Sequence, residues 1–299
     1  MRIAVLLYGH LRDFENCADS LCEYLLSHQE SDVFIHTWDE KDHNSKCWHE
    51  QRVEASKVDE QVVDLIKSKY NPKGLIVEHQ EKYAQEKMLH LSYLPGVEMS
   101  SAIPHFMFYS MNKANQLRKE YEAAEDVSYD YVFVTRPDVR LKKIFDLNYY
   151  LNEIDVLGLD MSACRFYGPF EKMSIGGVSI SRSNDLFFFA KPNVIDKYIE
   201  VNQVTSDEDV QMYGLTILSI FTAKEIRNGI IPIPLTYSMS ADWDYSSIRQ
   251  LPVQQSQPRQ YKAWKKMIYM IGATLLYPIS RLQKKYRLFN YDEYKKEFS

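Results

Sequence analysis

Glycine and proline are scarce in this sequence, with 10 and 11 among its 299 residues. No low-complexity tract or internal repeat is visible, so the composition excludes a collagen-like, repetitive or disordered chain. Hydrophobic residues make up 45% and charged residues 26%, which is ordinary for globular proteins. A chain of this length and composition can bury a sizeable core in one large domain.

Cysteine is also rare, and its spacing excludes the common zinc motifs. The four cysteines are Cys17, Cys22, Cys47 and Cys164. They form no CxxC pair and no Cys/His cluster with zinc-ligand spacing. This usage is typical of a reduced chain, so we expect a cytoplasmic protein.

Long apolar runs are missing as well. No stretch of about 18 apolar residues exists, so no transmembrane helix is expected. Near the N-terminus, Arg2 precedes a short apolar run from Ile3 to Tyr8, and no small-residue cleavage site follows. This pattern favours a buried strand over a signal peptide.

The net charge of -5 hides an asymmetry between the two ends of the chain. Residues 245–299 hold 11 Lys and Arg against 3 Asp and Glu, whereas the remaining residues hold 25 against 38. An acidic body argues against a general nucleic-acid-binding protein, so no nucleic-acid partner is expected. A basic end indicates one localised contact with an anionic surface.

The basic end surrounds an apolar stretch, residues 267–279, that is too short to span a bilayer. Such a pattern favours a helix in the membrane interface, where each basic residue contributes on the order of 1 kcal/mol. A helix packed on the protein body is the alternative. We predict a catalytic body of residues 1–244 and a membrane-associating segment of residues 245–299. Through residues 259–287 the protein would lie peripherally on the cytoplasmic face of an anionic membrane.

Short apolar runs alternate with helical periodicity along the body. The expected strands are 3–8, 32–36, 75–77, 131–134, 156–159, 178–180 and 230–233, the last at an edge because of its proline. The expected helices are 14–28, 57–69, 104–125 and one that begins near Ser206. This order predicts an α/β fold with a mainly parallel sheet and helices on both faces. In such folds, ligands bind beyond the carboxyl ends of the strands.

Polar residues follow the first expected strand, in the sequence Tyr8-Gly9-His10-Leu11-Arg12, just before a helix. Glycine permits a tight turn near a ligand, a helix start offers free N–H groups, and an arginine fork fits a diphosphate. We predict that Tyr8, Gly9, His10 and Arg12 bind a nucleotide. A plain turn with a surface arginine is the alternative.

Trp38 and Asp39 follow the second expected strand. The indole could stack on a base or a sugar, and the carboxylate could hold a ribose hydroxyl. A tryptophan packed under a loop, with Asp39 as a helix cap, is the alternative.

The most informative segment is an apolar strand that runs directly into Arg136-Pro137-Asp138 and Arg140. A carboxylate at a strand end is suitably placed to hold Mg²⁺ or Mn²⁺ against a diphosphate. Neighbouring arginines can neutralise phosphate charge as a leaving group departs. A turn aspartate after proline is the alternative for Asp138.

These three segments together resemble GT-A glycosyltransferases, in particular the small bacterial enzymes of capsule and O-antigen synthesis. The resemblance covers about 240 residues in outline and implies a GT-A-like, Rossmann-type fold with a nucleotide-sugar donor. In that family an Asp-X-Asp motif at this strand end holds the metal, which implies that Asp138 is a metal ligand. Because Arg136 stands in the first position, it could instead take over charge neutralisation, and metal dependence is left open.

Two later segments complete the expected site. Gly176 and Gly177 precede a strand, and in the resembled family such a loop lies beside the donor sugar; a tight entry turn is the alternative. Glu208 and Asp209 resemble the family's acidic motif, whose last aspartate accepts the proton of the acceptor hydroxyl in inverting enzymes. Acidic residues of a first helical turn are the alternative.

The sequence therefore predicts a hexosyltransferase-type glycosyltransferase that moves a sugar to a lipid-linked or oligosaccharide acceptor in surface-polysaccharide synthesis. A non-catalytic carbohydrate- or membrane-binding protein is one rival. A sugar-nucleotide pyrophosphorylase is the other, although the loop after the first strand is short and has one glycine for that class.

Overall fold

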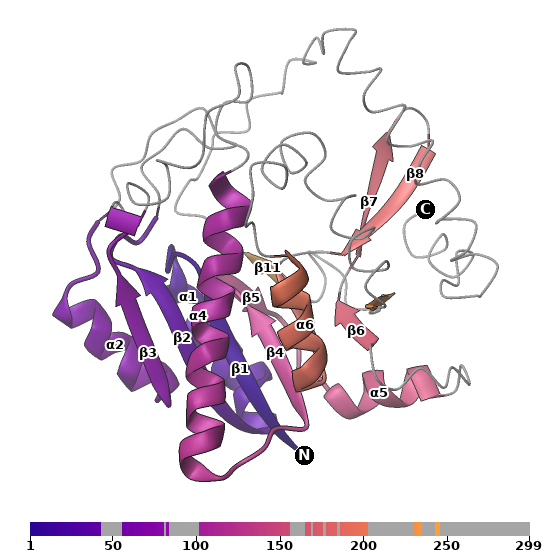
Figure 1. Ribbon diagram of the computed structural model, residues 1–299, viewed down its shortest axis with the longest axis horizontal. Coiled ribbons are helices and arrows are strands. Elements are labelled where there is room, and N and C mark those ends of the chain that lie inside the picture. Colours follow the sequence, from indigo (N-terminus) through magenta and orange to yellow (C-terminus); the bar gives the residue numbers. More distant parts are fainter. Residues whose placement is uncertain are drawn as a thin grey trace, which may run out of the picture.

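The computed structural model describes ten stretches of the chain. These are residues 1–42, 56–80, 82–83, 102–155, 165–168, 170–175, 178–183, 186–202, 230–234 and 243–245. Within them, a twisted sheet lies between two sets of helices (Figure 1).

Within the described stretches, the sheet has seven strands in the order β10-β6-β9-β4-β1-β2-β3. Its strands are β1 (Arg2–Tyr8), β2 (Glu30–Trp38), β3 (Gly74–Glu78), β4 (Tyr131–Thr135), β6 (Arg165–Gly168), β9 (Phe187–Ala190) and β10 (Ile231–Pro234). Among these described strands, only β9 runs antiparallel to its neighbours, and the other neighbours pair in parallel. The prediction of an α/β fold with a mainly parallel sheet is confirmed.

The helices cover both faces of the sheet. They are α1 (Phe14–Tyr24), the short 3-10 helix η1 (Leu26–His28), α2 (Glu60–Tyr70), α4 (Ala102–Glu125), α5 (Leu147–Asp155) and α6 (Pro192–Asn202). Local signals set the ends of α2, because the Asp59 side chain accepts from the N–H of Val62 at 2.9 Å and Asn71 ends the helix in a left-handed conformation.

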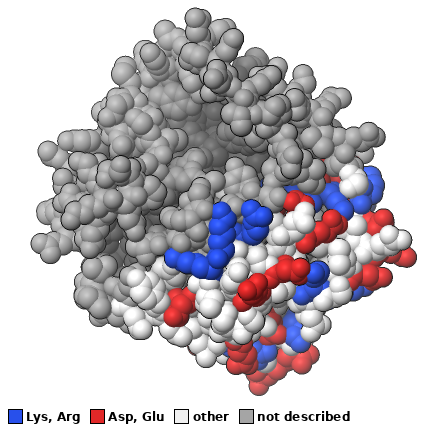
Figure 2. Space-filling model, turned by 180° about the vertical axis from the view of Figure 1, so that it is seen from behind, with Lys and Arg blue, Asp and Glu red and all other residues white. Residues whose placement is uncertain are grey.

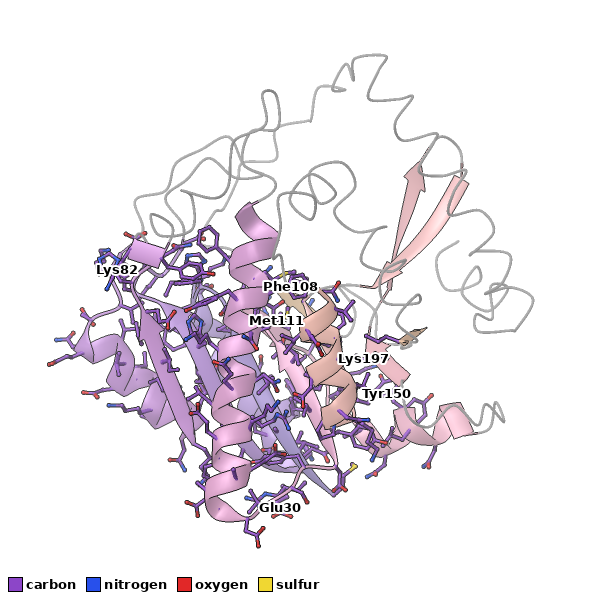
Figure 3. All side chains as sticks on the ribbon, in the orientation of Figure 1. Glu30, Lys82, Phe108, Met111, Tyr150 and Lys197 are labelled. Carbon is purple, nitrogen blue, oxygen red and sulfur yellow. The ribbon has the colours of Figure 1, made fainter. Side chains whose placement is uncertain are left out.

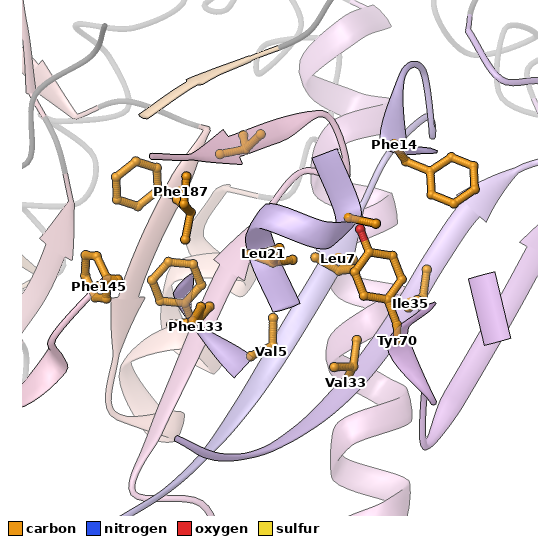
Figure 4. Packing of buried hydrophobic residues seen from close by; sticks show 14 of the residues in the cluster. Val5, Leu7, Phe14, Leu21, Val33, Ile35, Tyr70, Phe133, Phe145 and Phe187 are labelled. Atoms are coloured by element: carbon orange, nitrogen blue, oxygen red, sulfur yellow. The ribbon is translucent and has the colours of Figure 1, made fainter. Parts of the chain in front are cut away.

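The apolar sequence of β1 explains its central place. Val5 and Leu7 belong to the core cluster under α1 and α2, as the close view in Figure 4 shows. Ala4 and Leu6 belong to the cluster on the opposite face, under α4 and α6. A strand covered on both faces needs a continuous apolar run, and β1 supplies one.

The second cluster joins α4 to α6. Phe108 and Met111 of α4 are buried in it and are labelled beside α6 in Figure 3. The Phe108 ring lies 5.9 Å, centroid to centroid, from that of Tyr198 on α6. Arg118 of α4, also buried, donates to Asp196 of α6 at 2.7 Å. The two helices therefore form one layer on this face.

Two smaller sheets accompany the main one. β5 (Val139–Leu141) pairs with β11 (Trp243–Tyr245), and β7 (Phe170–Ile175) pairs with β8 (Val178–Ser183), both antiparallel. The expected strand 178–180 therefore lies in a hairpin and not in the main sheet. The proline-containing strand β10 lies at the sheet edge, as predicted.

The other expected elements agree with the structure where it describes them. Helices 14–28, 57–69 and 104–125 correspond to α1 with η1, α2 and α4. The expected strand 156–159, the helix near Ser206 and the membrane segment, apart from Tyr245 in β11, lie outside the described residues. None of the helices in the described stretches has the length and apolar character needed to cross a membrane.

The described surface carries both signs of charge. Seen from behind, several Lys and Arg side chains lie together at its upper border, and Asp and Glu side chains are spread below them (Figure 2). No uniform field of one sign covers the described part of this face.

Candidate functional site

The strand order places a topological switch point beside β1. The chain passes from β1 to β2 and β3 on one side of the sheet, and β4 then joins the other side of β1. In open α/β sheets, ligands bind outside the carboxyl ends of the strands at such a point. Here β1 ends at Tyr8 and β4 ends at Thr135, so the loops that begin at Gly9 and Arg136 form the candidate site.

Three side chains from these two loops meet in what we call the arginine–aspartate cluster: Arg12, Arg136 and Asp138. Asp138 Oδ1 accepts from Arg136 Nε at 2.8 Å, and Asp138 Oδ2 accepts from Arg12 Nη1 at 2.9 Å. Arg136 Nη2 also donates to Asp138 Oδ2. The sequence prediction that Arg12 and the Arg136–Asp138 turn share one edge of the sheet therefore agrees with this geometry.

The acidic and basic side chains of the cluster differ in their exposure to solvent. The Asp138 side chain is fully buried at 0% exposure, whereas those of Arg12 and Arg136 are 22% and 18% exposed. Arg12 Nε has a second acidic partner, Asp42 Oδ1 at 3.4 Å, whose side chain is 3% exposed. The carboxylates are thus more deeply buried than the arginine side chains that they hold.

The two arginines also fix the protonation of Asp138. Burial alone would raise its pKa, but the neighbouring charges and hydrogen bonds of Arg136 and Arg12 outweigh that effect and lower the pKa to about 2. Asp138 is therefore a carboxylate at neutral pH and acts as the counterion that holds both guanidinium groups.

The turn after β4 positions this carboxylate. Val139 N–H donates to the Arg136 carbonyl at 3.2 Å, which closes a turn with Pro137 in the position that proline favours. Cys17 of α1 donates through Sγ to the Asp138 carbonyl at 3.4 Å. The cluster is therefore held by β4, by α1 and by the loop between β1 and α1.

The turn after β1 requires unusual backbone conformations. Gly9 has a φ of +87°, and a Cβ placed there would meet nothing within 4 Å. Glycine is therefore needed for its conformation and not for lack of space. Arg12 has a φ of 47° and donates its N–H to the Lys41 carbonyl at 2.6 Å, which directs the chain into α1.

A buried polar network supports the Gly9 turn from below. The Gly9 N–H donates to Ser110 Oγ of α4 at 2.7 Å, and Ser110 Oγ lies 2.7 Å from His36 Nδ1. His36 Nε2 lies 3.3 Å from Glu78 Oε2, which accepts from the Tyr109 hydroxyl at 2.7 Å. Since Ser110 and His36 are fully buried, the network holds the turn in place and cannot present Ser110 as a nucleophile.

Burial and hydrogen bonding set the charges of this network. Burial lowers the pKa of His36 despite the nearby Glu78. The close contact with the His36 ring and the hydrogen bond from the Tyr109 hydroxyl, helped by the charge of Lys113, outweigh desolvation and lower the pKa of Glu78 to about 2. A neutral imidazole beside an ionised carboxylate is the resulting state at neutral pH.

Two other residues that the sequence suggested as ligand contacts, at the ends of β1 and β2, lie too deep in the protein to form a ligand-binding surface. Tyr8 and Trp38 are buried at 1% exposure. The Trp38 ring is stacked on Tyr109, with centroids 5.8 Å apart and an interplanar angle of 17°, and it also contacts Tyr83. The alternative of a packed tryptophan therefore fits this geometry better than stacking on a base.

Asp39 and His10 are joined to the end of β3. Asp39 Oδ1 accepts from the Gln80 N–H at 3.0 Å, and Asp39 Oδ2 accepts from Lys57 at 3.2 Å. Burial opposes ionisation of Asp39, but these bonds prevail and lower its pKa. His10 Nε2 lies 2.8 Å from Gln80 Oε1. Both side chains thus stabilise the loops that border the site.

Four residues that the sequence did not single out take part in this region: Asp42, Glu78, Tyr109 and Ser110. Their role depends on contacts between segments far apart in the chain, such as the separation of 101 positions between Gly9 and Ser110. Four expected residues, Gly176, Gly177, Glu208 and Asp209, lie outside the described residues.

The described side chains do not fit a divalent cation. Both oxygens of Asp138 accept hydrogen bonds from guanidinium groups, and a metal bound there would lie against two positive charges. Within the described stretches, no group of three or more His, Cys, Asp or Glu residues is placed to hold a metal ion. The chemistry of this donor set is that of an anion site.

Comparison with known proteins adds no family. No protein-family model matches the chain, and a search of curated proteins finds no significant relative. The fold and the site define the protein's class as an α/β protein with an arginine-bearing switch point.

Proposed function

We propose that this protein is a glycosyltransferase that binds the diphosphate of a nucleotide-sugar donor at the carboxyl ends of β1 and β4. One observation carries the proposal: Arg12 and Arg136, 124 positions apart in the sequence, converge on the buried carboxylate of Asp138 at the topological switch point. The mainly parallel sheet with helices on both faces is consistent with the GT-A-like architecture that the sequence resemblance implies.

The proposed chemistry suits this arrangement. An acceptor hydroxyl oxygen forms a bond to the anomeric carbon, while the bond from that carbon to the donor phosphate oxygen breaks. The electron pair of the broken bond leaves with the nucleoside diphosphate, and the hydroxyl proton passes to a base. Arg12 and Arg136 would stabilise the charge that develops on the departing phosphate.

Other parts of the proposal rest on sequence alone. Asp209, or Glu208 in its place, would accept the hydroxyl proton if the reaction inverts the anomeric configuration. Residues 259–287 would contact an anionic membrane on its cytoplasmic face and bring the protein to a lipid-linked acceptor.

Ligand binding tests the proposal directly. We expect UDP, GDP or one of their sugars to raise the unfolding temperature of the purified chain, because a ligand at 100 times its Kd adds about 2.7 kcal/mol of stability. The same donor should release nucleoside diphosphate when a lipid-linked acceptor is added. CMP-sugars, which carry a single phosphate, should stabilise the chain less.

A matched pair of variants ties the effect to the site. Arg136→Gln should weaken donor binding, whereas Arg2→Gln should not. Arg2 also pairs with a buried aspartate, Asp32, through a 2.6 Å contact. It lies at the amino end of β1, however, and the candidate site lies at the carboxyl end. If no nucleotide or nucleotide-sugar stabilises the wild-type chain, the proposal is wrong.

A further inference from the structure

Resting on the proposed function, we infer that guanidinium groups alone, without a divalent cation, neutralise the donor's diphosphate at this site. The observation behind it is that protein donors already occupy the carboxylate of Asp138. The one carboxylate that follows β4 directly is fully buried and is bound on both oxygens by Arg12 and Arg136. Its charge is already compensated from within the protein.

Within the described residues, three more carboxylates near the site also hold donors of the protein. Asp42 is buried beside Arg12 Nε. Asp39 accepts from the Gln80 N–H and from Lys57, and Glu78 accepts from Tyr109. Mg²⁺ and Mn²⁺ bind best where several oxygen ligands converge on one open point. These carboxylates instead each hold a donor of the protein.

The positive charges are placed where a diphosphate would arrive. Both arginine side chains are partly exposed, at 22% for Arg12 and 18% for Arg136, whereas their counterions are buried. Arg12 also stands two positions before Phe14, where α1 begins, so the positive end of that helix dipole lies close to this arginine along the chain. A planar guanidinium can donate two parallel hydrogen bonds to phosphate oxygens, which gives orientation as well as charge.

The buried carboxylates have a distinct role in this scheme. They fix the direction of each guanidinium before the donor binds, so that less side-chain entropy is lost on binding. Asp138 is thus a positioning residue that acts through Arg12 and Arg136.

Calorimetric titration of the full chain with UDP, GDP and inorganic pyrophosphate tests the inference, with each probe measured once in EDTA and once in Mn²⁺ or Mg²⁺. We expect the Kd of the bound probes to change by no more than about threefold between the two conditions. We expect Arg12→Gln or Arg136→Gln to raise the Kd about tenfold or more, the effect of losing a charge-assisted hydrogen bond. The Kd of Arg136→Lys should lie between those of wild type and Arg136→Gln, because lysine keeps the charge but loses the planar fork.

Arg2→Gln is the matched control and should bind like wild type, with thermal unfolding recorded for every variant. If the wild-type chain binds a nucleoside diphosphate only when Mn²⁺ or Mg²⁺ is present, the inference is overturned while the proposed function stands. The wild-type comparison needs no variant, so it decides this point even if a substitution unfolds the protein. Binding in EDTA that survives both glutamine substitutions overturns the role of the arginines. If none of the probes or donors binds in either condition, both proposals fail.

Discussion

Replacing Asp138 by asparagine should destabilise the protein strongly, because it removes the common counterion of two arginines. Asparagine keeps the shape of the side chain but carries no charge. Whichever way its amide turns, an NH₂ group would face a guanidinium N–H, since both carboxylate oxygens accept from arginine. The variant therefore loses an ion pair and gains a contact between donors.

The pKa of Asp138 indicates the scale of the cost. Folding lowers it from 3.8 to about 2, and a shift of this size corresponds to about 2 kcal/mol between the charged and neutral forms. The donor contact adds to this, so we expect Asp138→Asn to lower the free energy of unfolding by about 3 kcal/mol, in the range for a broken buried ion pair. Urea denaturation at pH 7 measures the change as a shift in midpoint with an unchanged slope.

The contribution of Asp138 to the free energy of unfolding should also decrease at acid pH. Because the folded pKa of Asp138 lies below its unfolded value, the contribution is complete above pH about 4 and is lost as the pH falls toward about 2. The difference in stability between wild type and Asp138→Asn should therefore shrink over that interval.

Asp19→Asn provides the control. Asp19 pairs with Lys69 on the surface, with 74% of its side chain exposed, and losing such a pair costs about 0.5 kcal/mol or less. If Asp138→Asn unfolds at the same urea concentration as Asp19→Asn, the arginine–aspartate cluster is not the stabilising centre described above.

Three further substitutions test the Gly9 turn, the network that supports it and the contact between α4 and α6. Gly9→Ala should cost about 1–2 kcal/mol through backbone strain alone, since its added Cβ would meet no neighbour; an unchanged unfolding midpoint would contradict this. Ser110→Ala should cost about 1–3 kcal/mol, because the Gly9 N–H and the His36 ring both lose their partner; amide exchange at Gly9 should then accelerate, and an unaltered rate would speak against the network. Arg118→Met should cost about 2 kcal/mol because it leaves the carboxylate of Asp196 without its guanidinium; adding Asp196→Asn should recover part of the loss, and a purely additive double variant would refute the coupling.

The sequence predicts the central strands well because their apolar pattern lies within each strand and needs no information on its neighbours. β1 is buried on both faces, so nearly every residue in it must be apolar, and that run is visible without any partner. The two loops at the switch point could also be located from the sequence, because Gly9 and Arg136 directly follow apolar strands. The proximity of Arg12 to Asp138 could therefore be predicted from topology alone.

Contacts that depend on three-dimensional packing could not be predicted in this way. β9, with the run Phe187-Phe188-Phe189, reads equally well as a strand or as a buried helix, and it pairs with β4, some 50 positions earlier, in the opposite direction. Trp38 invited a ligand-stacking role, but its actual neighbours, Tyr83 and Tyr109, come from segments 45 and 71 positions away. No periodicity in the sequence carries that information.

The position of β4 beside β1 has a consequence for how the protein is made. β2 can join β1 early in synthesis, since their paired residues are about 28 positions apart, whereas β4 must wait for roughly a hundred more. During that interval Arg12 has no Asp138 to orient it. A nascent or truncated chain that ends before β4 would thus carry only Arg12 of the arginine–aspartate cluster, and the complete site should form together with the most non-local pairing in the sheet, that of β1 with β4.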